Sequence, residues 1–161
     1  MDRLTTVAFT GHRTYRGEAD EALFALLCRL CEQGMRTFLC GMAVGFDLAA
    51  AEQVIALRER YPEVRLVAVI PFAGQARSFS AVERRRYERL LEVADEQILL
   101  SETYYKGCYQ ARNYYLVEHT AALVAWYDGS VGGTQQTFLA ALHRGLRVEN
   151  LGTICPDPKL F

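Results

Sequence analysis

Short apolar runs alternate with longer amphipathic stretches along the chain, and the apolar runs predict strands. They fall at residues 5–10, 36–40, 64–70, 96–100, 121–127 and 146–151. Several are apolar without interruption, as from Leu66 to Ile70, whereas a strand with one solvated face would alternate with polar residues. Uninterrupted runs of this length are typical of parallel strands that helices cover on both faces.

The stretches between these runs have the periodicity of helices. They comprise an apolar stripe at Leu23, Leu26, Leu27 and Leu30 that Gly34 closes, a stripe over 48–55, a capping box at Ser80–Glu83, and the segments 106–119 and 134–144. This alternation predicts an α/β fold, a single doubly wound Rossmann-like domain with a mostly parallel sheet of about six strands and helices on both faces. We expect the core over 5–151 and an irregular tail over 152–161.

Three of the apolar runs end at glycine-rich turns that contain polar residues, and a helical pattern follows each turn. The turns are Gly11-His12-Arg13, the segment Gly41–Asp47, and the segment Tyr127–Gly129 that continues to Gly132-Gly133-Thr134. The carboxyl ends of parallel strands gather on one edge of a sheet, so the three turns can line one crevice. Glycine lets the backbone approach a ligand, and the first N–H groups of a helix attract phosphate. The pattern therefore predicts a nucleotide-type pocket.

The second and third turns offer the clearest candidate contacts. Phosphate binding is favoured at Gly132-Gly133-Thr134, because a plain N-cap at Thr134 would not require two glycines that are costly in chain entropy. Asp47 either caps the helix that follows it or accepts hydrogen bonds from ligand hydroxyls or a base. Glu52 either lines the same mouth or faces solvent. If the protein is an enzyme, Asp47 and Glu52 are the candidate acid–base residues.

The first turn and a later aromatic segment add further candidates. Arg13 can clamp a phosphate bidentately, and His12 is either a proton shuttle or, the interpretation that we favour, a hydrogen-bonded turn residue. In the segment 104–115, tyrosines can stack on bases, and Arg112-Asn113 can bind phosphate or base edges; alternatively, half of the tyrosines pack in the core. The arginines at 84–86 are expected to form a solvated face.

Composition and charge exclude several other classes of function. A net charge of −1 and the absence of a basic stripe lead us to expect no nucleic-acid partner. The chain has no signal-peptide core and no apolar run long enough to span a bilayer, and its five cysteines fit a reducing cytosol. The pair Cys28 and Cys31 has metal-ligand spacing but lies within a helical stripe, so we expect no metal. A monomer and a homo-oligomer are both left open.

These motifs resemble those of the YpsA-like bacterial proteins. The resemblance runs in order over about residues 5–151 through Val7–Arg13, Gly41–Asp47 with Ala51-Glu52, Pro71-Phe72 with Gln75, Arg112-Asn113, and Tyr127–Gly129 with Gly132–Thr134. That family belongs to the SLOG superfamily of Rossmann-like domains, whose members include the DNA-processing protein DprA and the LOG phosphoribohydrolases. The resemblance implies a pocket for a nucleotide or a nucleotide-derived ligand. No cofactor is evident from the sequence.

We expect the ligand to contact Gly11, His12, Arg13, Gly41, Gly45, Asp47, Phe72, Arg112, Asn113, Asp128, Gly132, Gly133 and Thr134. Phe72 would pack on an apolar face of the ligand. LOG-type enzymes have a glutamate three residues after the threonine of the last turn, where this chain has Thr137. A sensing or regulatory binding role is therefore favoured. Cleavage of the glycosidic bond of a nucleoside monophosphate is the first alternative, and DprA-like binding of single-stranded DNA through the region 77–89 and the tyrosines is the second.

Overall fold

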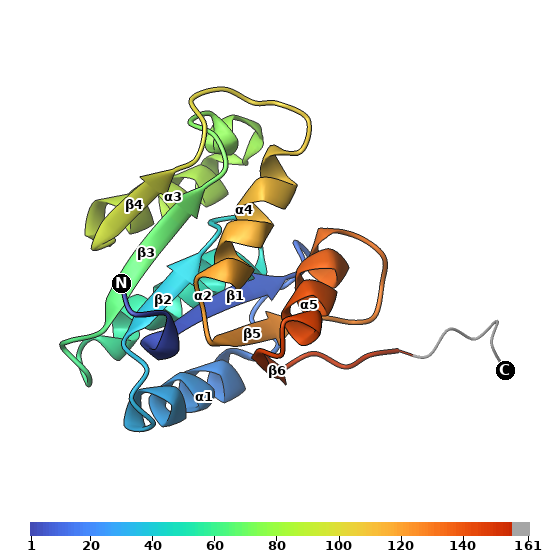
Figure 1. The fold of residues 1–161 in the computed structure, drawn as a ribbon. Coiled ribbons are helices and arrows are strands. Elements are labelled where there is room, and N and C mark those ends of the chain that lie inside the picture. Colours follow the sequence, from blue (N-terminus) through green and yellow to red (C-terminus); the bar gives the residue numbers. More distant parts are fainter. Residues whose placement is uncertain (156–161) are drawn as a thin grey trace, which may run out of the picture.

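The computed structural model describes residues 1–155, in which six strands form one sheet and five α-helices cover it (Figure 1). The strands are β1 (Thr6–Gly11), β2 (Thr37–Cys40), β3 (Arg65–Ile70), β4 (Glu96–Leu99), β5 (Ala122–Trp126) and β6 (Arg147–Asn150). The helices are α1 (Asp20–Glu32), α2 (Phe46–Leu57), α3 (Ala81–Val93), α4 (Cys108–Glu118) and α5 (Gly133–His143), with short 3-10 helices η1 (Arg3–Thr5) and η2 (Gln75–Ser78). Each predicted strand and helix is confirmed.

All strand pairs are parallel, and the strand order is β4-β3-β2-β1-β5-β6. In the centre, Val7 of β1 pairs with Phe38 of β2 on one side and with Ala122 of β5 on the other. The chain moves outward from β1 to β4 and then returns to the opposite side of β1 to form β5. Such a reversal leaves a crevice at the carboxyl ends of the two strands that flank it, here β1 and β5.

The two faces of the sheet carry different helices. One buried cluster unites α1, α2 and α3 with the side chains of Phe9 and Phe38. The alternate strand residues Ala8 and Leu39 face the other way and pack with Leu116 of α4 and with α5. In Figure 1, α4 and α5 lie together in front of the sheet. Helices on both faces explain why the strands are continuously apolar, and they confirm the doubly wound Rossmann-like architecture.

Two predicted helix boundaries have the expected local chemistry. The Ser80 hydroxyl accepts a hydrogen bond from the Glu83 N–H at 3.2 Å, and the Glu83 carboxylate accepts one from the Ser80 N–H at 3.3 Å. This is the capping box that the sequence predicted. Gly34 follows the end of α1 with a φ of +101°, a left-handed conformation that glycine adopts without strain. The Cys28 and Cys31 side chains are buried in α1.

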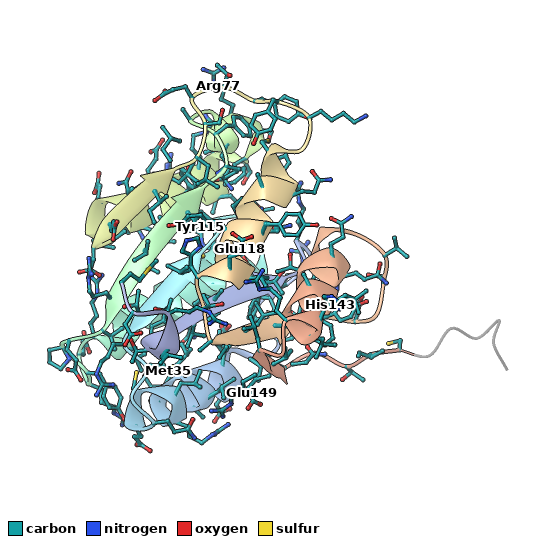
Figure 2. The ribbon with its side chains drawn as sticks, viewed as in Figure 1. Met35, Arg77, Tyr115, Glu118, His143 and Glu149 are labelled. Carbon is teal, nitrogen blue, oxygen red and sulfur yellow. The ribbon has the colours of Figure 1, made fainter. Side chains whose placement is uncertain are left out.

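The C-terminal ends of α4 and α5 lie at the edge of the sheet opposite to the crevice. Arg144 and Glu118 form an ion pair of 4.0 Å there, and Figure 2 shows Glu118 and His143 on these two helix ends. The N-termini of both helices consequently point toward the carboxyl ends of the strands. Within residues 1–155 no helix has the length and apolar character to cross a membrane. Residues 152–155 are irregular, as predicted for the tail, and the rest of the tail, 156–161, lies outside the described residues.

Candidate functional site

A cavity of about 330 Å³ lies at the crevice between β1 and β5. The end of β1, the beginning of α2, one face of α4 and the N-terminus of α5 form its walls. Nine of the residues predicted to contact a ligand line it, namely Gly11, His12, Arg13, Asp47, Arg112, Asn113, Gly132, Gly133 and Thr134. Segments separated by more than a hundred positions in the sequence therefore meet in one cavity, as the turn pattern predicted.

Within the described part of the chain, no side chain caps the N-terminus of α5. Gly132 occupies the N-cap position with φ 150° and ψ −163°, a conformation that is essentially restricted to glycine. Thr134 lies inside the first turn, so the alternative in which it caps the helix is wrong. The first N–H groups of a helix need external acceptors, and no side chain supplies one here. Since these residues line the cavity, the arrangement suits an anion.

Asp47 also lies inside its helix rather than at the N-cap. Gly45 is the N-cap of α2, and Asp47 follows within the first turn, so the capping interpretation of Asp47 is wrong as well. One carboxylate oxygen, Oδ2, accepts a hydrogen bond from the Ala43 N–H at 3.2 Å. The other, Oδ1, is buried without a partner among the described residues, although the side chain lines the cavity. A buried polar atom without a partner is rare and points to a missing donor.

Burial changes the acidity of this carboxyl group. Asp47 is only 6% exposed, and this burial raises its pKa to about 6, although Arg112 and the Ala43 N–H both act in the opposite direction. The loop before it is strained, because the buried Met42 has a φ of 61°. Strain and a perturbed pKa at one position are typical of functional sites.

One face of α4 supplies the third wall. Tyr109, Arg112, Asn113 and Leu116 recur at helical spacing and all line the cavity. The Arg112 guanidinium is buried, which lowers its pKa, whereas the nearby Asp47 acts to raise it. Its Nη1 donates to the Gly41 carbonyl oxygen, and its Nε donates to Asn113 Oδ1 at 2.8 Å. Because Oδ1 is occupied, Asn113 can offer its Nδ2 group, which lies beside Gly133.

The turn after β1 joins the ends of β1 and β5. A Cβ atom on Gly11 would lie 2.4 Å from the Phe46 ring, so only glycine fits between the strand and α2. His12 Nε2 accepts a hydrogen bond from the Asp128 N–H at 3.1 Å and lies 2.9 Å from Asp128 Oδ1. These contacts agree with the interpretation of His12 as a turn residue. Arg13 is exposed at the mouth of the cavity.

Five other candidates do not line this cavity. Gly41 lies beneath the Arg112 guanidinium, Asp128 supports His12, and Phe72 packs edge-on against Tyr109 with ring centroids 5.9 Å apart. Gly45 and Glu52 line a neighbouring cavity. Glu52 forms an ion pair with Arg86. The alternative in which Glu52 lines the same cavity as Asp47 is therefore wrong.

Tyr109 also lines the cavity and lies in the aromatic segment 104–115, although it is not among the predicted ligand contacts. Its position was available from spacing, because it precedes Arg112 by three residues and Asn113 by four. Thr10 and Ala43 also line the cavity without having been named. Thr10 lies near the end of β1, and Ala43 lies in the turn Gly41–Asp47.

Comparison with known proteins agrees with this arrangement. A family model described as the YspA SLOG family (YpsA) matches residues 18–151. The uncharacterized SPbeta prophage-derived protein YoqJ of Bacillus subtilis is 31% identical over 128 residues, which cover 72% of this chain and 75% of that protein. The residues that the family model matches include the turns that supply Asp47 and Gly132–Thr134.

The fold is also similar to that of DNA processing protein A (DprA). The Streptococcus pneumoniae protein superposes with a TM-score of 0.67 and 18% identity over 91% of this chain and 50% of its own. DprA of Helicobacter pylori, whose structure describes its single-stranded DNA binding mode, gives 0.65 and 17% over 92% of this chain and 65% of its own. The chain thus spans one half to two thirds of these proteins, and the likeness concerns the fold. It does not support our expectation that nucleic acid is excluded as a partner.

Proposed function

Because the chain belongs to the YpsA SLOG family, we propose that its cavity binds a nucleotide or a nucleotide-derived ligand in a sensing or regulatory role. The main support for the proposal is that one cavity contains two groups whose hydrogen-bonding capacity is unused. Among residues 1–155, Asp47 Oδ1 has no donor, and no side chain accepts from the N-terminus of α5. A nucleotide supplies both, since it has a phosphate at one end and hydroxyl or amino donors at the other.

The residues around the cavity can divide the contacts between the parts of such a ligand. The phosphate lies at Gly132–Thr134, where the Asn113 amide adds a donor. Asp47 accepts a hydrogen bond from the ribose or the base. Tyr109, which is 37% exposed, offers its ring to the base, and Arg13 covers the mouth. A volume of about 330 Å³ lies at the lower end of the range for small-molecule sites.

A thermal-shift screen tests the proposal directly. At about 100 times its dissociation constant, a ligand adds about 2.7 kcal/mol of stability. For a chain of this size, that corresponds to a rise of roughly 5–11 °C in Tm. We expect at least one such rise in a panel of nucleotides, dinucleotides and cyclic nucleotides. Flat melting curves across the panel, with well-folded protein, would contradict the proposal.

Two variants connect the effect to the site. Asp47→Asn should weaken the binding of the ligand found by about 1.5–3 kcal/mol, because a charged acceptor is lost. Glu118→Gln is the matched control, since Glu118 lies at the far end of α4, outside both cavities, and pairs with Arg144. It should leave affinity unchanged. Equal effects of the two substitutions would remove Asp47 from the binding site.

Hydrolysis of the glycosidic bond is a second candidate function, and the acidity of Asp47 favours it. With a pKa of about 6, this carboxyl group can hold and release a proton near neutral pH. Thr137 cannot do so, and its hydroxyl donates to the Gly133 carbonyl oxygen at 3.0 Å inside α5. Of the two carboxyl candidates, Asp47 lines the cavity, whereas Glu52 lines the neighbouring one and pairs with Arg86.

Single-stranded DNA is a third candidate, favoured by the likeness to the H. pylori DprA. The arginine run on α3 gives it little support. Arg84 donates to the carbonyl oxygens of Ala76, Arg77 and Phe79, and Arg86 pairs with Glu52. Two of the three arginines are thus engaged within the protein, so the run offers few cations to a phosphate backbone.

A further inference from the structure

The cavity of about 330 Å³ between β1 and β5, the first cavity, offers a ligand several hydrogen-bond donors and a single carboxylate. The donors are the first N–H groups of α5, the Asn113 Nδ2 group and the Arg13 guanidinium. Among residues 1–155, Asp47 is the only carboxylate in the lining, and its Oδ1 atom has no donor. This lining suits an anion that also carries a hydrogen-bond donor.

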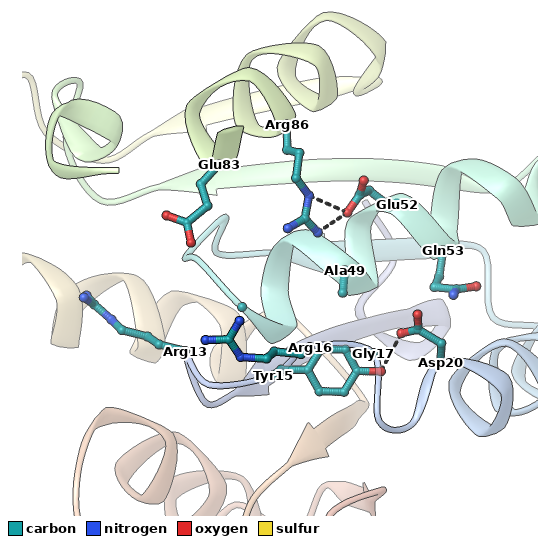
Figure 3. A pocket seen from close by; sticks show the side chains of 11 residues that line it. Arg13, Tyr15, Arg16, Gly17, Asp20, Ala49, Glu52, Gln53, Glu83 and Arg86 are labelled. Carbon is teal, nitrogen blue, oxygen red and sulfur yellow. Dashed lines mark hydrogen bonds and ion pairs between the residues drawn. The ribbon is translucent and has the colours of Figure 1, made fainter. Parts of the chain in front are cut away.

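The neighbouring cavity of about 460 Å³ differs in this respect (Figure 3). Three carboxylates line it, and each accepts a hydrogen bond from the protein. Figure 3 shows Glu52 bound by Arg86 and Asp20 bound by the Tyr15 hydroxyl, and the capping box occupies Glu83. A buried carboxylate oxygen without a donor therefore distinguishes the first cavity from its neighbour.

The anion site and an exposed aromatic ring lie one helical turn apart on the rim of the first cavity. A Cβ atom on Gly133 would lie 3.9 Å from Asn113 Nδ2, so Asn113 marks the anion site on α4. Tyr109 precedes Asn113 by four residues, and residues at this spacing have their Cβ atoms about 5–6 Å apart on one helix face. Asp47 is buried, whereas Gly133 and Tyr109 are exposed, so the carboxylate lies at the floor.

We propose that Asp47 Oδ1 accepts a hydrogen bond from a sugar hydroxyl and makes the first cavity selective for nucleotides with a free ribose diol. This inference rests on the proposed function and deepens it, because it decides between ribose and the base as the partner of Asp47. The ligand class is a ribonucleoside phosphate whose 2′ and 3′ hydroxyl groups are unsubstituted. Asp47 is then the residue that disfavours nucleotides without these groups.

The order of the parts of a nucleotide matches this arrangement. The sugar lies between the phosphate and the base, so a phosphate at Gly133 and a base on the Tyr109 ring bring the sugar to the floor that holds Asp47. An amino group of the base stays at the rim in this orientation.

The burial of Oδ1 also favours a hydroxyl over an amino group of the base. Oδ1 is nearly closed off, and the last torsion of an aspartate side chain is soft, so a small turn of the carboxylate can meet a slender group. A hydroxyl stands out from the sugar ring on a rotatable bond. A base amino group lies in the plane of a flat ring, which would have to enter the floor beside the buried charges of Asp47 and Arg112.

Isothermal titration with two matched series of probes tests the inference. One series contains the ribonucleoside 5′-monophosphates of adenine, hypoxanthine, cytosine and uracil, and the other contains their 2′,3′-dideoxy forms. We expect each ribonucleotide to bind about tenfold or more tightly than its dideoxy form, because a hydrogen bond to a charged acceptor is lost. Bases with an exocyclic amino group should give the same ratio as bases without one.

Asp47→Asn should move the two series in opposite directions. Ribonucleotides should bind more weakly, because the charged acceptor is gone. Dideoxynucleotides should bind as well or better, because they no longer seal a charged oxygen from water without a donor. Glu118→Gln, at the far end of α4, should keep the wild-type ratio for every base. A variant that had lost its fold would weaken both series together, and the wild-type ratio tests the inference without any variant.

The other outcomes separate this inference from the function on which it rests. Equal affinity of the ribo and dideoxy forms would refute the sugar contact, while the cavity would keep its nucleotide. A preference for adenine and cytosine over hypoxanthine and uracil, independent of the sugar, would assign Asp47 to the base amino group and overturn the inference. If neither series binds although other nucleotides raise the Tm in the thermal-shift screen, this inference fails alone. Flat melting curves in that screen as well would refute both proposals.

Discussion

The guanidinium of Arg112 is anchored to the carbonyl oxygen of Gly41, which also accepts a hydrogen bond from Gln75 Nε2 at 2.9 Å. This contact joins α4 on one face of the sheet to the turn that follows β2. It also explains the glycine, because a Cβ atom at position 41 would lie 2.7 Å from Arg112 Nη1. The contact holds a buried positive charge near Asp47 and stabilises the ionised form of that carboxyl group.

Arg112→Gln should therefore raise the pKa of Asp47 above its present value of about 6. Glutamine can still donate to the Gly41 carbonyl oxygen but carries no charge, so burial would act on Asp47 with less opposition. The measurement is a titration of the Asp47 side-chain carboxyl carbon by NMR. Arg85→Gln, at an exposed position of α3, is the control and should leave the titration unchanged. An unaltered Asp47 midpoint in Arg112→Gln would contradict the electrostatic coupling.

Asp47→Asn should stabilise the folded protein at neutral pH while it weakens ligand binding. Burial raises the folded-state pKa from 3.8 to about 6, so the wild-type protein loses stability as the pH rises through this window. The shift corresponds to up to about 3 kcal/mol. Asparagine carries no such cost, and the stability difference should grow from near zero at about pH 4 to a plateau above about pH 7.

Urea unfolding across this pH range measures the effect, with Glu52→Gln as the comparison. Glu52 forms a surface ion pair with Arg86, and its loss should change stability by less than about 1 kcal/mol at any pH. A pH-independent difference between wild type and Asp47→Asn would show that the carboxyl group is not desolvated in the folded state.

The two glycines at the start of α5 should respond differently to alanine. Gly132 has a backbone conformation closed to alanine, so Gly132→Ala should cost about 1–3 kcal/mol of stability. A Cβ on Gly133 would meet Asn113 Nδ2 at 3.9 Å, which is an ordinary contact. Gly133→Ala should keep or slightly increase stability but weaken nucleotide binding, because the methyl group lies where the phosphate approaches. Thermal melts with and without nucleotide distinguish the two; equal stability of both variants would contradict the assignment.

We expect nucleoside monophosphates to be bound but released intact. Acid–base catalysis contributes roughly 10²–10⁴-fold, and Thr137 cannot supply it at the position where LOG-type enzymes have a carboxylate. Chromatographic detection of free base after prolonged incubation is the measurement. Robust turnover that disappears in Asp47→Asn, with affinity preserved, would instead assign Asp47 as the acid–base residue of an enzyme.

Short single-stranded oligonucleotides should bind weakly near physiological ionic strength. Arg84 and Arg86 are used within the fold, so α3 can neutralise few phosphates, and the affinity should have a shallow dependence on salt. Fluorescence anisotropy at increasing salt concentration measures this slope. Submicromolar affinity that is lost on replacement of Arg84, Arg85 and Arg86 together would place nucleic acid ahead of the small-molecule ligand.

Much of the fold and of the site geometry could be predicted from the sequence, because both depend on short-range rules. Continuous apolar runs predicted a parallel sheet, and glycine turns after three of them predicted which segments would meet. The structural roles of individual side chains were harder to predict from the sequence. Asp47 and Thr134 both fit the pattern of N-cap residues, yet glycines one or two positions earlier begin their helices. Cap positions depend on backbone angles that sequence pattern alone does not specify.

The place of Glu52 and Phe72 could not be predicted for a different reason. Glu52 follows Asp47 by five residues, and this spacing alone did not show whether it shared the first cavity. Its partner Arg86 belongs to another helix, so the ion pair depends on how α2 and α3 pack. Phe72 is similarly held by Tyr104 and Tyr109 from a distant segment. The neighbouring cavity that Gly45 and Glu52 line could not be predicted from the sequence either. Three helices and a loop form it, and they come together only in the folded chain.

The strand order has a consequence for how the site comes into existence during synthesis. Asp47 and the turn after β1 are made early, whereas β5 must insert beside the central strand β1, which has already been translated, and the N-terminus of α5 follows β5. A ribosome-bound chain that has reached only α4 contains Asp47 and lacks the wall of the cavity that Gly132–Thr134 form. A ligand of the proposed class would therefore find both halves of its cavity only after β5 has docked on β1. Binding of such a ligand would then favour chains in which β5 and α5 are in place over chains that end at α4.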